Sequence, residues 1–102
     1  MTWLTVRELR DLEPDVPLGI LVEGVAVCLV YTCGEIYAVH DECTHAAVPL
    51  SEGDVADRTI ECWMHGSRFD LRTGAALNLP ATKPVRTYPA RLLNGRVQIL
   101  PP

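Results

Sequence analysis

The start of this sequence lacks a long apolar run, and the chain as a whole carries little positive charge. Met1 to Glu8 contain no uninterrupted apolar stretch of the length that a signal peptide or a membrane span requires. We therefore expect a cytoplasmic protein without a membrane partner. Nine basic residues stand against thirteen acidic ones, and the formal net charge of −4 argues against nucleic acid as a partner.

Internal repeats, low-complexity tracts and interdomain linkers are also missing. With 102 residues and 48% hydrophobic content, the chain is predicted to form one domain, residues 1–102, around a modest core. Two of its four cysteines, Cys28 and Cys33, lie outside any motif, and a disulfide framework is unexpected in a reducing compartment. Cys28 stands among valines and leucines and is expected in the core, whereas Cys33 precedes Gly34 in a predicted turn.

Short apolar runs separated by turn residues predict an all-β domain. Both alternating faces of Val25–Thr32 are largely apolar, so this strand is expected to be central and covered on both sides. Asn94-Gly95 is the strongest hairpin signal, because a type I′ turn needs two residues that tolerate positive φ. Val6–Leu12 are compatible with a short helical turn, and Pro101-Pro102 should end the last strand. The predicted strands are Ile20–Val22, Val25–Thr32, Glu35–Val39, Ala90–Leu93 and Arg96–Leu100.

Two mixed motifs, Cys43-Thr44-His45 and Cys62-Trp63-Met64-His65, each supply one cysteine and one histidine. The usual structural zinc spacings instead place cysteine with cysteine and histidine with histidine. Two mixed loops can straddle a binuclear iron-sulfur cluster, with Cys43 and Cys62 on the inner iron and His45 and His65 on the outer one. Buried thiols with core histidines, and a mononuclear zinc site, are the alternatives.

With these motifs the sequence resembles the Rieske ferredoxins that serve bacterial aromatic-ring-hydroxylating dioxygenases. The resemblance also rests on His65 to Asp70, on Thr73-Gly74, and on Pro80-Ala81, which resembles the proline-containing loop that covers the cluster. It implies an antiparallel β sandwich with an inserted cluster-binding subdomain at about residues 41–83, and one Rieske 2Fe-2S cluster.

The neighbours of the candidate ligands bear on the reduction potential. Rieske proteins of the cytochrome complexes also resemble this chain, but each of their cluster loops carries one further cysteine, and these two cysteines form a disulfide. This chain has Val48 and Met64 at those positions. High-potential relatives use a serine and a tyrosine hydroxyl toward the cluster sulfurs; Ser67 retains the first, and Phe69 cannot donate in place of the second. We therefore expect a potential toward the low end of the Rieske range.

Further residues are expected around the cluster. A side chain at position 66 could block backbone amides from the sulfurs, Trp63 and Met64 could shield the cluster or form an apolar docking rim, and Pro80 resembles the rigid element of the cover loop. His40 is expected only to end a strand. The predicted neighbours of the cluster are Gly66, Ser67, Phe69, Pro80, Trp63 and Met64.

The resemblance implies a soluble one-electron carrier that performs no bond chemistry. Its implied partners are a ferredoxin reductase, expected to contain flavin, and a terminal ring-hydroxylating oxygenase, and the carrier is expected to be a monomer. A fixed Rieske small subunit of another oxidoreductase, as in some nitrite reductases, is one alternative. A zinc-stabilised interaction module without redox activity is another.

Charge is distributed unevenly along the chain. Residues 1–65 hold twelve acidic residues and three arginines, whereas residues 66–102 hold six basic residues and one acid, Asp70. An acidic patch near the cluster would steer docking onto a positively charged partner, although a solvated face without a partner is equally compatible. The acids expected there are Asp41, Glu42, Glu52, Asp54, Asp57 and Glu61.

Overall fold

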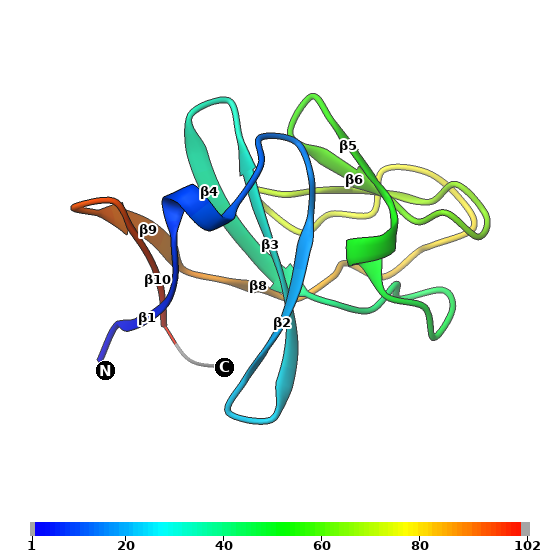
Figure 1. Cartoon of the computed structure of the whole chain (residues 1–102). Coiled ribbons are helices and arrows are strands. Elements are labelled where there is room, and N and C mark those ends of the chain that lie inside the picture. Colours follow the sequence, from blue (N-terminus) through cyan, green and yellow to red (C-terminus); the bar gives the residue numbers. More distant parts are fainter. Residues whose placement is uncertain (1, 101–102) are drawn as a thin grey trace.

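The computed structural model describes residues 2–100 and contains ten short strands and two 3-10 turns (Figure 1). None of its helices is long and apolar enough to cross a membrane. The elements are β1 (Leu4–Glu8), η1 (Leu9–Asp11), β2 (Leu18–Val22), β3 (Val25–Thr32), β4 (Glu35–His40), η2 (Leu50–Glu52), β5 (Asp54–Ala56), β6 (Thr59–Glu61), β7 (Arg68–Asp70), β8 (Thr87–Tyr88), β9 (Ala90–Leu93) and β10 (Arg96–Ile99).

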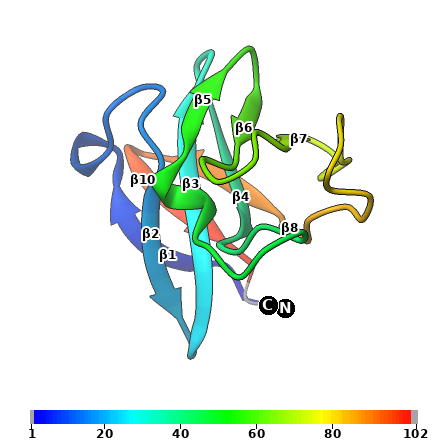
Figure 2. The same cartoon turned by 90° about the vertical axis from the view of Figure 1, so that its right-hand side faces the viewer.

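The strands form three sheets in which every pairing is antiparallel. Their orders are β1-β10-β9, β2-β3-β4-β8 and β5-β6-β7. The predicted all-β class is therefore confirmed. In Figure 1 the sheet β5-β6-β7 and its loops lie on the right, opposite β1, β9 and β10, and Figure 2 shows that end face-on.

Strand β3 separates two hydrophobic cores, as the two apolar faces of its sequence predicted. Val27 and Leu29 point into one core with residues from β2, β4 and β10. Cys28 and Val30 point into the other core, which holds Cys43 and Cys62. Because successive side chains of a strand point to opposite faces, one strand contributes to both cores. The buried Cys28 confirms its expected place in the core.

Tight turns with positive φ at both central residues join several of the strands. Asn94 and Gly95 have φ of 51° and 76°, which confirms the predicted hairpin. The β2–β3 turn, Glu23-Gly24, has φ of 50° and 82°. Cys33 lies in the β3–β4 turn, which confirms the turn predicted there, and its side chain is exposed.

The beginning of the chain agrees only in part with the sequence analysis. Val6–Leu12 were compatible with a short helical turn, and the structure has a 3-10 turn at Leu9–Asp11, whereas Val6 to Glu8 belong to β1. Pairing with β10 provides backbone partners that local sequence does not reveal. The other end of the chain also differs slightly: β10 ends at Ile99, one residue earlier than expected, and Pro101 and Pro102 lie outside the described residues.

Candidate metal centre

Two loops bring the four candidate ligands to one end of the molecule. The first loop follows β4 and contains Cys43 and His45; the second follows β6 and contains Cys62 and His65. The side chains divide by depth, since Cys43 is 3% and Cys62 1% exposed whereas both histidines are exposed. Cysteine therefore lies inside and histidine outside, in the order expected from the sequence.

The candidate ligands also meet as two like pairs. The imidazole rings of His45 and His65 lie edge to face, with their centroids 5.0 Å apart and a 74° angle between their planes. Cys43 and Cys62 lie in the same buried cluster, where their thiols are close enough to influence each other's ionisation. Among residues 2–100 no group of three or more His, Cys, Asp or Glu side chains is arranged to hold one metal ion. A binuclear Rieske centre takes its donors as two thiolates and two imidazoles, which is how these four side chains divide.

Short backbone hydrogen bonds give both loops their shape. In the first loop the Cys43 N–H donates to the Val48 carbonyl at 2.9 Å. In the second, the Cys62 N–H donates to the Ser67 carbonyl at 2.7 Å, and the Gly66 N–H donates to the Cys62 carbonyl at 3.0 Å. The two bonds fold residues 62–67 into a tight loop that ends at β7 and places His65 at its surface.

Gly66 lies in a turn whose backbone conformation restricts the choice of residue. No protein atom lies within 4 Å of a Cβ placed there, and the expectation that a side chain would block backbone amides from the cluster sulfurs stays a prediction. Its φ of +75° lies in the left-handed region, which side chains other than glycine enter at a cost. The turn that follows His65 therefore selects glycine by conformation.

The environment of Cys62 suits a metal-bound sulfur. Burial raises the pKa of the Cys62 thiol, the neighbouring Cys43 thiol adds to this rise, and the backbone N–H groups of Met64 and His65 act in the opposite direction by donating to the sulfur. A thiol that coordinates a metal is deprotonated, and N–H donors stabilise the thiolate. The buried thiols, the amides directed at Cys62 and the two imidazoles thus fit the donor set of a Rieske cluster.

Ser67 and Phe69 lie under the second loop. Ser67 is buried, and its Oγ accepts a hydrogen bond from the Ala81 N–H at 3.0 Å. Its hydroxyl hydrogen remains available as a donor. Phe69 is fully buried in the same core as Cys43 and Cys62, where its ring offers packing and no donor.

Several exposed apolar side chains lie in the second ligand loop and in the nearby residues 77–79, and we call them the apolar rim. Trp63 is 52% and Leu79 75% exposed, and Pro80 beside Leu79 is partly exposed. Large apolar groups gathered on a surface mark interaction sites more often than isolated ones do. The apolar rim consists of Trp63, Met64, Leu77 and Leu79.

The acidic residues are less concentrated near the ligands than expected. Asp57 lies in the β5–β6 turn, at the end of this hairpin away from Cys62. The Asp41 carboxylate accepts hydrogen bonds from the Ser51 N–H and hydroxyl, both at 2.7 Å, and so joins the first loop to η2. Asp54 faces Glu61 across β5 and β6, and Glu61 also faces Arg68 across β6 and β7, which offsets part of the negative charge.

Asp70 shapes the turn that leads from β7 toward the proline-containing loop. Its carboxylate accepts hydrogen bonds from the backbone N–H groups of Arg72 at 2.8 Å and Thr73 at 3.4 Å, and it pairs with the Arg72 guanidinium. Burial alone would raise the pKa of the Asp70 carboxyl, but these donors outweigh it and hold the pKa below its usual value. The turn is thereby fixed without any contribution from a cluster.

Sequence reasoning missed two polar residues that hold these loops together. The Thr44 hydroxyl donates to the Lys83 carbonyl at 2.8 Å. The Asn78 side chain bonds both Arg68 and Gly66, at 2.6 and 3.0 Å. Thr44 lies within the first motif and Asn78 outside both, but each bond joins loops that are distant in sequence, so only the folded structure reveals these roles.

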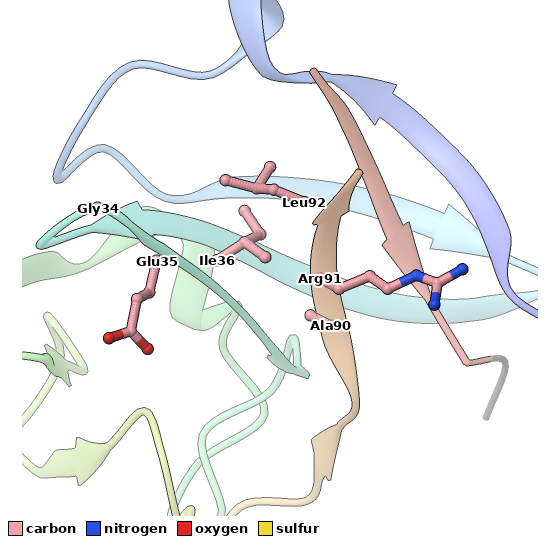
Figure 3. Close-up of a pocket in the computed structure, with 6 residues that line it drawn as sticks. All are labelled: Gly34, Glu35, Ile36, Ala90, Arg91 and Leu92. Carbon is pink, nitrogen blue, oxygen red and sulfur yellow. The ribbon is translucent and has the colours of Figure 1, made fainter. Parts of the chain in front are cut away.

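The main surface cavities lie away from the candidate ligands. One of about 210 Å³ lies between β4 and β9 and is lined by Gly34, Glu35, Ile36, Ala90, Arg91 and Leu92 (Figure 3). Ile36 and Leu92 face each other there, while the Arg91 guanidinium turns away to stack on Trp3 and to donate to Gln98. The walls of this cavity are about equally polar and apolar, and none of the candidate ligands contributes to them.

Known proteins resemble this chain in both sequence and structure. Residues 2–89 match the Rieske [2Fe-2S] domain. The ferredoxin component of the naphthalene 1,2-dioxygenase system of Pseudomonas putida is 45% identical over 98 residues, covering 95% of this chain and 93% of that protein.

Two solved structures agree with this result. The ferredoxin of carbazole 1,9a-dioxygenase from Nocardioides aromaticivorans IC177 has a TM-score of 0.94 and 35% identity, and the match covers both chains completely. A chain from a complex of reduced oxygenase and oxidised ferredoxin in carbazole 1,9a-dioxygenase has a TM-score of 0.88 and 30% identity, covering 95% of this chain and 91% of that one. The chain thus belongs to the Rieske [2Fe-2S] family, and within it to the ferredoxins, which carry electrons and are not the catalytic oxygenases.

Proposed function

We propose that this chain carries single electrons from a ferredoxin reductase to a terminal ring-hydroxylating oxygenase, with its cluster held by Cys43, His45, Cys62 and His65. The observation that carries the proposal is the division of these side chains into a buried thiol pair and an exposed imidazole pair. When bound, a Rieske 2Fe-2S cluster supplies one-electron redox chemistry at a higher potential than a four-thiolate cluster.

The protein contributes position and access. Cys43 and Cys62 are anchored in the hydrophobic core, which keeps water from the thiol side of the site. His45 and His65 stand at the surface, so this is where an electron would enter and leave. Cys43, Cys62 and their loops lie within residues 41–83, which we assign as the cluster-binding subdomain of a single domain spanning residues 1–102.

We assign the apolar rim as the contact surface for both redox partners. Trp63 and Met64 directly precede His65 in the second loop, and the Leu77 N–H donates to the Arg68 carbonyl just beyond that loop. A desolvated contact there would bring a partner's redox group close to the imidazoles. The carbazole dioxygenase complex, in which a similar chain accompanies an oxygenase, supports the choice of the terminal oxygenase. A flavin-containing reductase, a monomeric carrier and a cytoplasmic location complete the proposal.

One preparation tests the cluster assignment. We expect two irons and two acid-labile sulfides per chain, and a Rieske-type EPR spectrum after reduction. His65→Ala should abolish this spectrum, whereas His40→Ala should retain it, because His40 ends β4 and contacts Tyr88 instead. Zinc in place of iron, or a spectrum that survives His65→Ala, would overturn the assignment.

Reconstitution tests the role as a carrier. The protein should elute as a small monomer from a size-exclusion column and should support product formation by a naphthalene-type oxygenase when a ferredoxin reductase and NADH are present. Electron transfer should be second order in the carrier and the oxygenase. A stable stoichiometric complex with first-order transfer would instead favour a fixed subunit.

A further inference from the structure

The cover loop, which we define as residues 75–84, is hydrogen-bonded to both loops that carry the candidate ligands. Thr44 in the first loop donates to the Lys83 carbonyl at 2.8 Å. In the second loop, the Ser67 hydroxyl accepts from the Ala81 N–H at 3.0 Å. The cover loop is itself closed at its base, because the Val85 N–H donates to the Gly74 carbonyl at 2.8 Å.

Asn78 of the cover loop makes two further hydrogen bonds, both through its side chain. Its Oδ1 accepts from the Arg68 N–H at 2.6 Å, and its Nδ2 donates to the Gly66 carbonyl at 3.0 Å. These two backbone groups lie on either side of Ser67, so the Asn78 amide occupies the place that a peptide of a neighbouring strand would take. Next to it, the Leu77 N–H donates to the Arg68 carbonyl at 2.8 Å.

The Gly66 peptide is the part of the second loop that most needs such support. It follows His65 directly and has φ of +75°, and glycine permits many other backbone conformations. The Gly66 N–H donates to the Cys62 carbonyl, and its carbonyl accepts from Asn78. Gly66 is therefore held on both sides, and only the Asn78 contact comes from outside the loop.

We propose that Asn78 is a positioning residue: by holding Gly66 and Arg68, it fixes the second loop so that His65 keeps the orientation needed at the cluster. This inference rests on the proposed function, since His65 is a candidate ligand there. No disulfide joins the two loops among the described residues. Val48 and Met64 stand at the positions where the Rieske proteins of the cytochrome complexes carry their disulfide cysteines. The hydrogen bonds of the cover loop supply the cross-connection between the two loops.

The role of Asn78 is in orientation more than in global stability. Asn78 is exposed, so water can replace either hydrogen bond at modest cost in folding free energy. Water cannot replace the fixed direction that a side chain anchored in a neighbouring loop imposes on Gly66. Removing the amide should therefore affect cluster properties more than thermal unfolding.

The test compares the reconstituted holoprotein with three variants. Asn78→Leu keeps a similar volume and removes both hydrogen bonds, whereas Asn78→Asp keeps the acceptor for Arg68 and removes the donor for Gly66. Thr82→Ala is the matched control, since Thr82 is exposed on the same loop and its side chain makes no hydrogen bond within residues 2–100. The readouts are the EPR spectrum of the reduced protein, the rate of absorbance loss in excess chelator, and the thermal midpoint.

We expect Asn78→Leu to lose its cluster about fivefold faster than wild type, because a hydrogen bond of ordinary strength is worth about this factor. Its EPR spectrum should also be shifted or broadened. Asn78→Asp should fall between Asn78→Leu and wild type, and Thr82→Ala should match wild type. Unchanged EPR spectra and cluster-loss rates in both Asn78 variants would overturn the inference, as would a lowered thermal midpoint alone. If Asn78→Leu retains no cluster, the inference is tested by comparing the EPR spectrum and the rate of cluster loss of Asn78→Asp with those of Thr82→Ala. A wild-type protein without a Rieske spectrum would contradict the proposed function instead.

Discussion

Ser67 combines burial with a hydroxyl whose hydrogen is still free to donate. Its oxygen accepts from Ala81, so a bond from the hydroxyl to a cluster sulfur would complete its hydrogen bonding. A donor to a cluster sulfur stabilises the reduced state, which carries additional negative charge. The chemistry at this one position therefore bears directly on the reduction potential.

Ser67→Ala should lower the midpoint potential by about 40 mV, which is what a hydrogen bond of about 1 kcal/mol corresponds to in a one-electron couple. The midpoint would be measured by spectroelectrochemical titration, with Thr82→Ala as the control because it removes a hydroxyl outside the site. An unchanged midpoint in Ser67→Ala would show that this hydroxyl makes no bond to the cluster.

The two remaining cysteines should differ sharply in reactivity. Burial raises the pKa of the Cys28 thiol above its usual range, and the nearby Asp41 carboxylate adds to the rise, whereas Cys33 is exposed in a turn. The thiolate is the reactive species, so Cys28 should stay unreactive at alkaline pH where Cys33 is alkylated.

Mass spectrometry after iodoacetamide treatment at pH 8.5 should find one label on the folded holoprotein and none on its Cys33→Ser variant. In denaturant all four cysteines of the wild type should react. A label on Cys28 in the folded protein would mean that the core beside β3 opens readily.

The four candidate ligands could be recognised from sequence because their spacing is local. Cys43 and His45 lie two positions apart, and Cys62 and His65 three positions apart, so each loop carries its own signature. Asn78 could not be found in this way, since its importance comes from Gly66 and Arg68, more than nine residues earlier in the chain. The assignment of the four side chains as ligands stays a prediction until iron is measured.

At the level of elements, the β2–β3 and β9–β10 hairpins use the same type of turn with different residues. Glu23 and Asn94 occupy the first central position, with φ of 50° and 51°, and each is followed by glycine. Asparagine tolerates the left-handed region better than glutamate does. The β9–β10 hairpin therefore has a more favourable turn sequence than the β2–β3 hairpin.

Glu23→Asn should raise the free energy of unfolding by about 0.5–1 kcal/mol, and the thermal midpoint by a few degrees. The reciprocal change, Asn94→Glu, should lower it by a similar amount. Thermal unfolding of both holoproteins by circular dichroism checks the pair. Equal midpoints for both variants would show that these turns tolerate either residue.

Sequence reasoning succeeded for elements whose signals are local and failed where pairing is distant. Val25–Thr32 was predicted with its correct ends and its central place, because both of its faces are apolar. β1 was missed because its partner, β10, lies at the other end of the chain. The start of β2 at Leu18 was also missed, since Leu18-Gly19 does not resemble a strand until it pairs with β3.

At the scale of the whole molecule, charge and apolar surface meet at the end that carries the histidines. Glu42 is exposed next to Cys43, Glu52 follows in η2, and Asp54 lies on β5, while Trp63 and Met64 of the apolar rim directly precede His65. Such a surface can attract a partner over a distance by charge and hold it by apolar contact.

Rising salt should slow second-order electron transfer to the oxygenase, because ions screen the attraction between an acidic surface and a basic partner. Stopped-flow measurements between about 20 and 500 mM salt would test this, since the screening length falls from above 20 Å to below 5 Å over such a range. The midpoint potential of the carrier alone, measured at both salt concentrations, is the control. An electron-transfer rate that does not depend on salt would show that the acidic residues form a solvated face and do not attract the partner.

The position of β3 between two cores has a consequence for assembly of the holoprotein in the cell. The core formed by Val27, Leu29 and their neighbours contains no candidate ligand, so it can form before any iron arrives. The core with Cys43 and Cys62 includes two thiols whose final environment depends on the inserted metal. Assembly of the holoprotein can then proceed in two steps, in which the first core folds and the metal completes the second.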